Sequence, residues 1–179
     1  MKTKITASLL LLLASCTSLD IDGVRMSAGL QPMKVAARTE INGQTDTDHA
    51  EDTAPVARVE LVNDLDPQTQ VGMVLGASRG TLGIVDFESY DLGAAVRHYI
   101  GEGQLRPFGE FTAGYRRFEV DDEDFGSAGT DLIFGSASVG LELRLGRMSI
   151  FAQGGYEGAY GDDFHTSGPT IMVGGAVTF

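Results

Sequence analysis

Apolar and polar residues alternate with a period of two along most of the chain, between clusters of turn-forming residues. The clearest stretch is 131–145, where the odd positions from Ile133 to Leu145 are apolar or small and the even ones include Glu142 and Arg144. Such alternation is typical of strands with two unlike faces. It predicts eight strands, over 23–38, 55–65, 69–79, 89–100, 106–120, 131–145, 147–160 and 169–179. We expect Pro32 to interrupt the first, because proline cannot donate to a ladder.

The connections between these strands are alternately long and short. The long ones are polar and often acidic, as in "INGQTDTDHAEDTA" and "DDEDFGSAGT", whereas "LDPQ", "GEGQL" and "LGRM" are compact turns. This pattern predicts an all-β, eight-stranded antiparallel up-and-down transmembrane barrel, with long acidic loops at one rim and short turns at the other. A sandwich would distribute its loop lengths more evenly between both ends.

The more polar face of the strands carries balanced charges of two kinds. Four arginines and four glutamates are distributed over five strands, and lysine is almost absent from them. Charges that are buried need partners, and arginine offers several donors in one plane. We therefore predict a plugged polar lumen with the apolar face turned to lipid. The predicted charge network contains Arg58, Glu60, Arg97, Glu110, Arg116, Glu142, Arg144 and Glu157.

The aromatic residues agree in part with a membrane barrel. Interfacial aromatic girdles should lie on the apolar face near strand ends, where Tyr90, Phe111, Tyr115, Tyr156, Tyr160 and Phe179 are found. The alternative is a soluble barrel, tethered by a lipid, whose apolar interior binds a small hydrophobic ligand.

The N-terminus has the layout of a secretory signal. Lys2 and Lys4 precede an apolar run at 5–14, which is too short to span a membrane as a helix. The sequence Leu-Ala-Ser-Cys at 13–16 resembles the lipobox of bacterial lipoproteins, which implies cleavage before Cys16 and acylation of its thiol. Cys16 is the only cysteine, so an intrachain disulfide is excluded. We expect a signal peptide at 1–15, a lipidated tether at 16–22 and a barrel domain at 23–179.

The net charge of the chain limits the classes of partner that it can bind. With 25 acidic and 13 basic residues the formal net charge is −12, which argues against binding nucleic acid. Divalent cations could still bridge the carboxylates to lipid phosphates. The acidic runs, which include Asp46, Asp48, Glu51 and Asp52, have no EF-hand spacing, and solvation is the commoner meaning of such runs.

The C-terminus resembles that of small outer-membrane barrels of the OmpA-like and porin-like class. Their last strand ends in Phe with apolar residues at alternating positions, and Phe179, Val177, Val173 and Ile171 match, with a small residue at Gly175. The resemblance covers about 23–179 and implies location in the outer membrane of a Gram-negative bacterium. It also implies a monomer that contacts outer-membrane lipid, lipopolysaccharide and the assembly machinery of that membrane. An ordinary signal without a lipobox is usual in that class, and this chain departs from it.

The chain offers little sign of catalysis. His49, His98 and His165 are isolated, with no metal-ligand spacing, so no metal or cofactor is expected. His98 reads as an interfacial residue. His165 and Ser167 resemble the H-x-S pair of barrel enzymes that deacylate lipid A, but the acidic partner expected about a dozen positions later is missing. A structural or surface-interaction role without general diffusion is therefore predicted, with the tethered ligand carrier and the hydrolase as alternatives.

Overall fold

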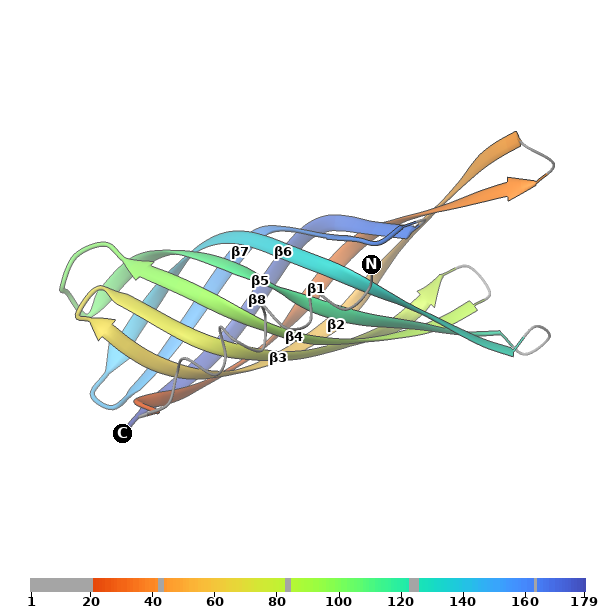
Figure 1. The fold of residues 1–179 in the computed structure, drawn as a ribbon. Helices are drawn as coiled ribbons and strands as arrows, with labels where there is room; N and C mark the ends of the chain where they lie inside the picture. The colour runs from red at the N-terminus through yellow and green to blue at the C-terminus, as the bar shows by residue number, and fades with distance from the viewer. Residues whose placement is uncertain (1–20, 42–43, 83–84, 123–125, 163) are drawn as a thin grey trace.

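The strands form one closed antiparallel barrel, in which each strand pairs with the next and β1 pairs with β8 (Figure 1). The computed structural model describes residues 21–41, 44–82, 85–122, 126–162 and 164–179. The elements are β1 (Gly23–Ile41), β2 (Gln44–Asp66), β3 (Thr69–Leu82), β4 (Val85–Tyr99), β5 (Leu105–Asp122), β6 (Gly126–Leu145), β7 (Met148–Tyr160) and β8 (Phe164–Thr178). The predicted all-β, eight-stranded antiparallel barrel is confirmed. The predicted signal peptide at 1–15 and the predicted acylation site, Cys16, lie outside the described residues.

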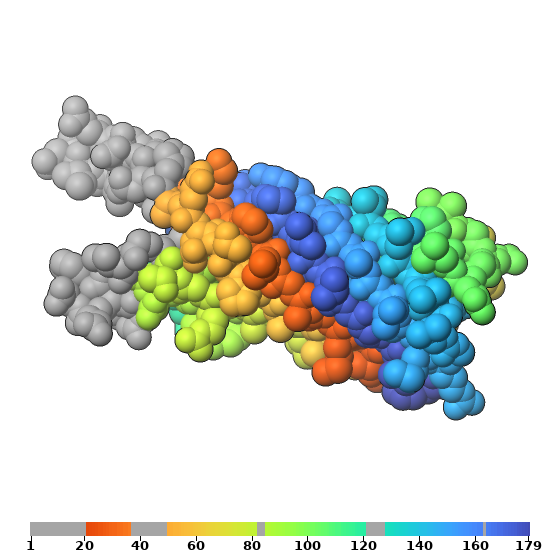
Figure 2. Space-filling view, turned by 180° about the vertical axis from the view of Figure 1, so that it is seen from behind, coloured from red at the N-terminus to blue at the C-terminus, as the bar shows by residue number. Residues whose placement is uncertain are grey.

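The two ends of the barrel differ. The turns after β2, β4 and β6, together with the C-terminus, form one end, which we call the short-turn rim. The hairpins β1–β2, β3–β4, β5–β6 and β7–β8 form the other, which we call the hairpin rim, and β1–β2 projects away from the rest (Figure 1). Figure 2 shows the strands crossing the wall obliquely, as the tilt of a closed barrel requires.

The prediction of long loops at the hairpin rim is wrong over most of their length. β1 and β2 stay paired up to Ile41 and Gln44, and β5 and β6 up to Asp122 and Gly126. In these two segments the polar composition predicts a loop, because apolar residues do not alternate along them. Backbone pairing in a hairpin satisfies its own hydrogen bonds and does not require such a face.

Pro32 interrupts only one of the two ladders of β1. It lies in register with Thr53 of β2, while pairing with β8 is recorded for Gly23–Leu30 and again for Lys34–Ala37. The flanking register places Pro32 opposite Pro169, so neither residue at this point can donate an N–H. The seam that closes the barrel therefore contains a break in its ladder.

Gly114 marks a close contact between the wall and a ring in the lumen. It lies opposite Gly93 across β4 and β5. A Cβ at Gly114 would lie 2.3 Å from the Leu92 carbonyl oxygen and 2.8 Å from the Phe134 ring. A residue without a side chain is required here, because the ring of Phe134 occupies the space.

In the described ranges, no helix is long and apolar enough to cross a bilayer.

Candidate functional site in the barrel lumen

Among the described residues, ten charged side chains are buried in the lumen, five of each sign. Seven of the eight predicted network residues are among them. The full set is Arg25, Arg58, Arg97, Arg106 and Arg116 with Glu60, Asp91, Glu110, Glu142 and Glu157. They divide into two clusters at different heights.

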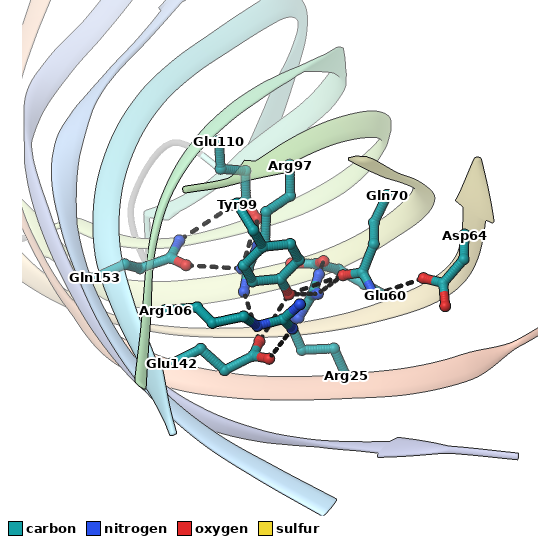
Figure 3. A network of polar contacts seen from close by, with 10 residues as sticks. All are labelled: Arg25, Glu60, Asp64, Gln70, Arg97, Tyr99, Arg106, Glu110, Glu142 and Gln153. Atoms are coloured by element: carbon teal, nitrogen blue, oxygen red, sulfur yellow. Dashed lines mark hydrogen bonds and ion pairs between the residues drawn. The ribbon is translucent and has the colours of Figure 1, made fainter. Parts of the chain in front are cut away.

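The first, which we call the rim-side cluster, lies toward the short-turn rim and contains Arg25, Arg97, Arg106, Glu60, Glu110 and Glu142 (Figure 3). Three ion pairs join residues in register on adjacent strands: Arg25 with Glu60, Arg97 with Glu110, and Arg106 with Glu142. Arg97 Nε donates to Glu110 over 2.7 Å, and Arg106 Nη2 to Glu142 over 2.8 Å.

Tyr99 connects these pairs across the lumen (Figure 3). Its hydroxyl donates to Glu142 over 2.7 Å and accepts from Arg25 over 3.2 Å. Aromatic rings also cover the guanidinium groups, with Arg97 3.9 Å from the centroid of Phe108 and Arg106 3.7 Å from that of Tyr99. Such cation–π contacts stabilise charges removed from water.

The second, which we call the central cluster, contains Arg58, Arg116, Asp91, Glu157 and the amide of Gln31. Arg116 donates to both oxygens of Asp91, over 2.6 and 2.7 Å, a bidentate geometry that carboxylates favour. Glu157 of β7 accepts from Arg116, from Arg58 of β2 and from Gln31 of β1. Strands that are not neighbours in the barrel wall are thereby joined.

Each cluster is neutral by itself: three arginines face three glutamates in the first, and two arginines face Asp91 and Glu157 in the second. Neutrality of this kind is what burial of charge requires.

The prediction for Arg144 is wrong, because its side chain is exposed. The pairing between β5 and β6 ends with Leu105 opposite Leu143. Arg144 is the next residue of β6, so β5 does not extend beside its side chain.

Sequence reasoning missed Arg25, Asp91 and Arg106. Asp91 is an even number of positions from Arg97 on one strand, and Arg106 is an even number from Glu110 on another. The alternation therefore places each of them on the same face as a predicted lumen residue. Arg25 was missed because the first strand has the weakest pattern.

The outer face is apolar along the middle and the short-turn end of the barrel. Val139 is 71% exposed and Ile171 66%. All six predicted interfacial aromatic residues are exposed, as are Val173 and Val177 of the C-terminal strand. The Phe179 backbone N–H donates to the Asp22 carbonyl over 2.8 Å, which ties the end of the chain to the start of the barrel.

The polarity of the two faces reverses near the hairpin rim. Outward side chains there are charged and include Lys34, Glu51, Arg79, Glu88, Arg117 and Asp131. Inward side chains form an apolar cluster that contains Met33, Val35, Ala54, Phe87, Phe118, Leu132, Phe134 and Ala159, with Val120 and Phe164 packed against it. We call this cluster the apolar layer. The segment of barrel around it has the polarity of a soluble protein.

The outward charges of this segment form exposed pairs. Lys34 Nζ lies 2.8 Å from Glu51, and Arg117 Nη1 lies 2.9 Å from Asp131. Hydrogen bonds from Arg117 lower the pKa of Asp131, and one from Lys34 lowers the pKa of Glu51. These side chains remain in water, where such pairs contribute little stability.

His165 and Ser167 lie on the outer face of β8, where the ring of His165 stacks on Tyr160 with centroids 6.1 Å apart. Ser167 is in register with Lys34. In the described parts of the chain, no hydrogen bond or ion pair joins His165 to a carboxylate. His98 also faces outward, 3.1 Å from the Thr69 hydroxyl, and the side chain of His49 lies outside the described ones. Within the described ranges, no three metal-ligating side chains come together.

Comparison with known proteins places this geometry in a class. Solved structures with similar folds include Neisserial surface protein A (TM-score 0.56, 14% identity, covering 87% of this chain and 97% of that one). The outer membrane protein OprG from Pseudomonas aeruginosa is similar (0.53, 12%, 88% and 96%), as is the outer membrane enzyme PagL (0.51, 14%, 87% and 99%). No family model and no curated protein matches the sequence. The chain therefore has the fold of small outer-membrane barrels.

Proposed function

We propose that this chain is an integral outer-membrane β-barrel protein with a closed polar lumen and a structural or surface-interaction role. The observation that carries the proposal is the polarity of the wall, which is apolar outside and charged inside over the middle and the short-turn end. Only a surrounding of lipid makes that arrangement favourable. A soluble ligand carrier would need the opposite arrangement at this level.

The closed lumen is argued from the two charge clusters. Ten buried charges and their aromatic neighbours occupy the interior, and ion pairs or hydrogen bonds cross it from wall to wall. Eight strands leave an interior that side chains can fill. We therefore expect no conductance from the purified protein in planar bilayers, and a large stable conductance would contradict the closed lumen.

Attachment to the membrane can be tested without assuming the lipid on Cys16. Variant Cys16→Ser removes the proposed acylation site and leaves the barrel unchanged. If strands span the membrane, the variant stays in the membrane fraction after carbonate or urea washing and still migrates differently on a gel before and after boiling. Release by washing would instead favour a tethered soluble barrel.

The role at the surface is inferred from the charged segment at the hairpin rim. Its outward carboxylates, among them Glu51, Glu88 and Asp131, suit contacts with lipopolysaccharide through divalent cations. Binding of the folded protein to lipopolysaccharide vesicles should then fall when a chelator removes the cations. Binding that a chelator leaves unchanged would contradict this contact.

A further inference from the structure

The apolar layer spans the whole cross-section of the lumen. Side chains enter it from β1, β2, β4, β5, β6, β7 and β8. On β3 the corresponding position is Gly80, which has no side chain. A Cβ there would lie 2.7 Å from the aromatic ring of Phe87, so that ring fills the space next to β3. Phe118 packs against two further rings of the layer, with its ring centroid 5.1 Å from that of Phe87 and 4.9 Å from that of Phe164.

This layer gives water few groups to bind. Its members are hydrocarbon side chains, and the polar groups in register with them include the hydroxyls of Ser89, Thr130 and Thr166 and the carboxylate of Asp52. Asp52 and Thr130 are partly exposed. The Ser89 hydroxyl is hydrogen-bonded to that of Ser78, whereas the Thr166 hydroxyl is buried without a partner among the described residues. A buried water needs two to four polar partners, which one free hydroxyl does not supply. Narrow apolar constrictions are barriers to ions because they exclude water.

The charge clusters below the layer have the opposite property. The Nε atoms of Arg25, Arg58 and Arg106 and Nη1 of Arg97 are buried donors without a hydrogen-bond partner in the structure. Such donors are costly unless water reaches them. A small cavity of about 20 Å³ at the short-turn rim, lined by Asp22, Arg25, Asp64 and Gln70, has room for one water beside the first of them.

We propose that the apolar layer is the barrier that closes the lumen, and that water entering from the short-turn rim hydrates the two charge clusters below it. The inference rests on the proposed function, a membrane barrel with a closed lumen. In this proposal the two kinds of residue have different roles. The buried ion pairs hold the strands of the wall together, and the hydrocarbon side chains of the apolar layer keep dissolved ions from passing through the lumen.

The test compares four forms of the full chain in planar bilayers, each first shown to be folded by its heat-modifiable migration. The layer variant is Phe87→Ser with Phe118→Ser. The cluster variant, Arg97→Gln with Glu110→Gln, removes one ion pair and keeps the lumen neutral. The matched control is Phe111→Ser, which makes the same kind of change on the outer face of β5.

We expect discrete openings from the layer variant and a silent baseline from the wild type, the control and the cluster variant. A folded but silent layer variant overturns the proposal, and so do openings in the cluster variant with its phenylalanines intact. If the double substitution prevents folding, the single variant Phe118→Ser takes its place, with the same expected openings. The cluster variant tests the proposal separately, because openings in it would contradict the proposal whatever the layer variant does. Conductance of the wild type would instead contradict the closed lumen itself, before any substitution is made.

Discussion

At the scale of single residues, the lumen depends on acceptors that serve several donors at once. Glu157 accepts hydrogen bonds from Gln31, Arg58 and Arg116, which come from three different strands. Its side chain is almost fully buried. Removal of its charge leaves the two arginines of the central cluster with one acid, Asp91, inside the barrel.

We therefore expect Glu157→Gln to lower the free energy of unfolding by about 3–5 kcal/mol, the usual cost of breaking a buried pair. Reversible denaturation by urea in lipid vesicles measures this change. The control is Glu51→Gln, which removes an exposed pair with Lys34 and should leave the midpoint almost unchanged. Equal effects of the two substitutions would contradict the role assigned to burial.

Two glycines of β5 make a second comparison. Gly114→Ala places a methyl group against the Leu92 carbonyl and the Phe134 ring, and should cost about 1–3 kcal/mol of stability. At Gly109, on the outer face of the same strand, an added Cβ meets nothing within 4 Å, so Gly109→Ala should change stability by less than about 0.5 kcal/mol. The same urea unfolding experiment compares the stability of the two variants. If Gly114→Ala were as stable as the wild type, the Phe134 ring would have to pack elsewhere.

At the scale of elements, the seam between β1 and β8 closes the barrel in spite of the proline pair. The register is the same on both sides of the break. Leu30 faces Ile171 before it and Lys34 faces Ser167 after it, so each strand advances by four residues between the two pairs. Ladder hydrogen bonds on both sides of the break, together with the bond from the N–H of Phe179 to the carbonyl of Asp22, hold β1 and β8 together.

A disulfide across this seam tests the closing register. In a Cys16→Ser background, Ala28→Cys and Val173→Cys are directly opposite and should oxidise readily, because facing residues of paired strands lie within disulfide range. Altered gel migration after boiling reports the link. Ala28→Cys with Ile171→Cys is offset by two residues and should stay reduced; preferential oxidation of that pair would indicate a shifted seam.

The strands themselves were predictable because alternation is clear wherever the outward side chains are apolar and the inward ones are charged. All eight were located, and seven of the eight proposed lumen charges are buried. Strand ends at the hairpin rim were not predictable, because polar residues there still pair through their backbones. Arg25 was missed for a related reason: its outward neighbours on β1 include small residues and Pro32, which weaken the pattern.

At the scale of the whole molecule, the reversal of polarity sets the boundary of the bilayer in the membrane placement proposed above. On β4 the outward positions change from Leu92 to Tyr90 and then to Glu88, while the inward ones change from Asp91 to Ser89 and then to Phe87. Alternation by itself could not separate a membrane barrel from a soluble one, because both polarities occur on the same strands at different heights.

This boundary can be mapped by fluorescence, because the chain contains no tryptophan. Leu92→Trp should be strongly quenched by lipids brominated along their acyl chains, and Glu88→Trp, on the same strand and face, only weakly. Both variants must first show heat-modifiable migration. Equal quenching at the two positions would mean that hydrocarbon covers the charged segment, which the placement proposed above does not allow.

The neutrality of each lumen cluster also constrains how this sequence can diverge. Loss of Asp91 alone would leave the central cluster with one uncompensated arginine, whereas loss of Asp91 together with the charge of Arg116 would not. Changes in the lumen should therefore accumulate as compensating pairs, since the intermediate with one change is the least stable form. Natural variants of this chain should have lost an arginine and its acid together, and the pairs lost should be those that face each other on adjacent strands.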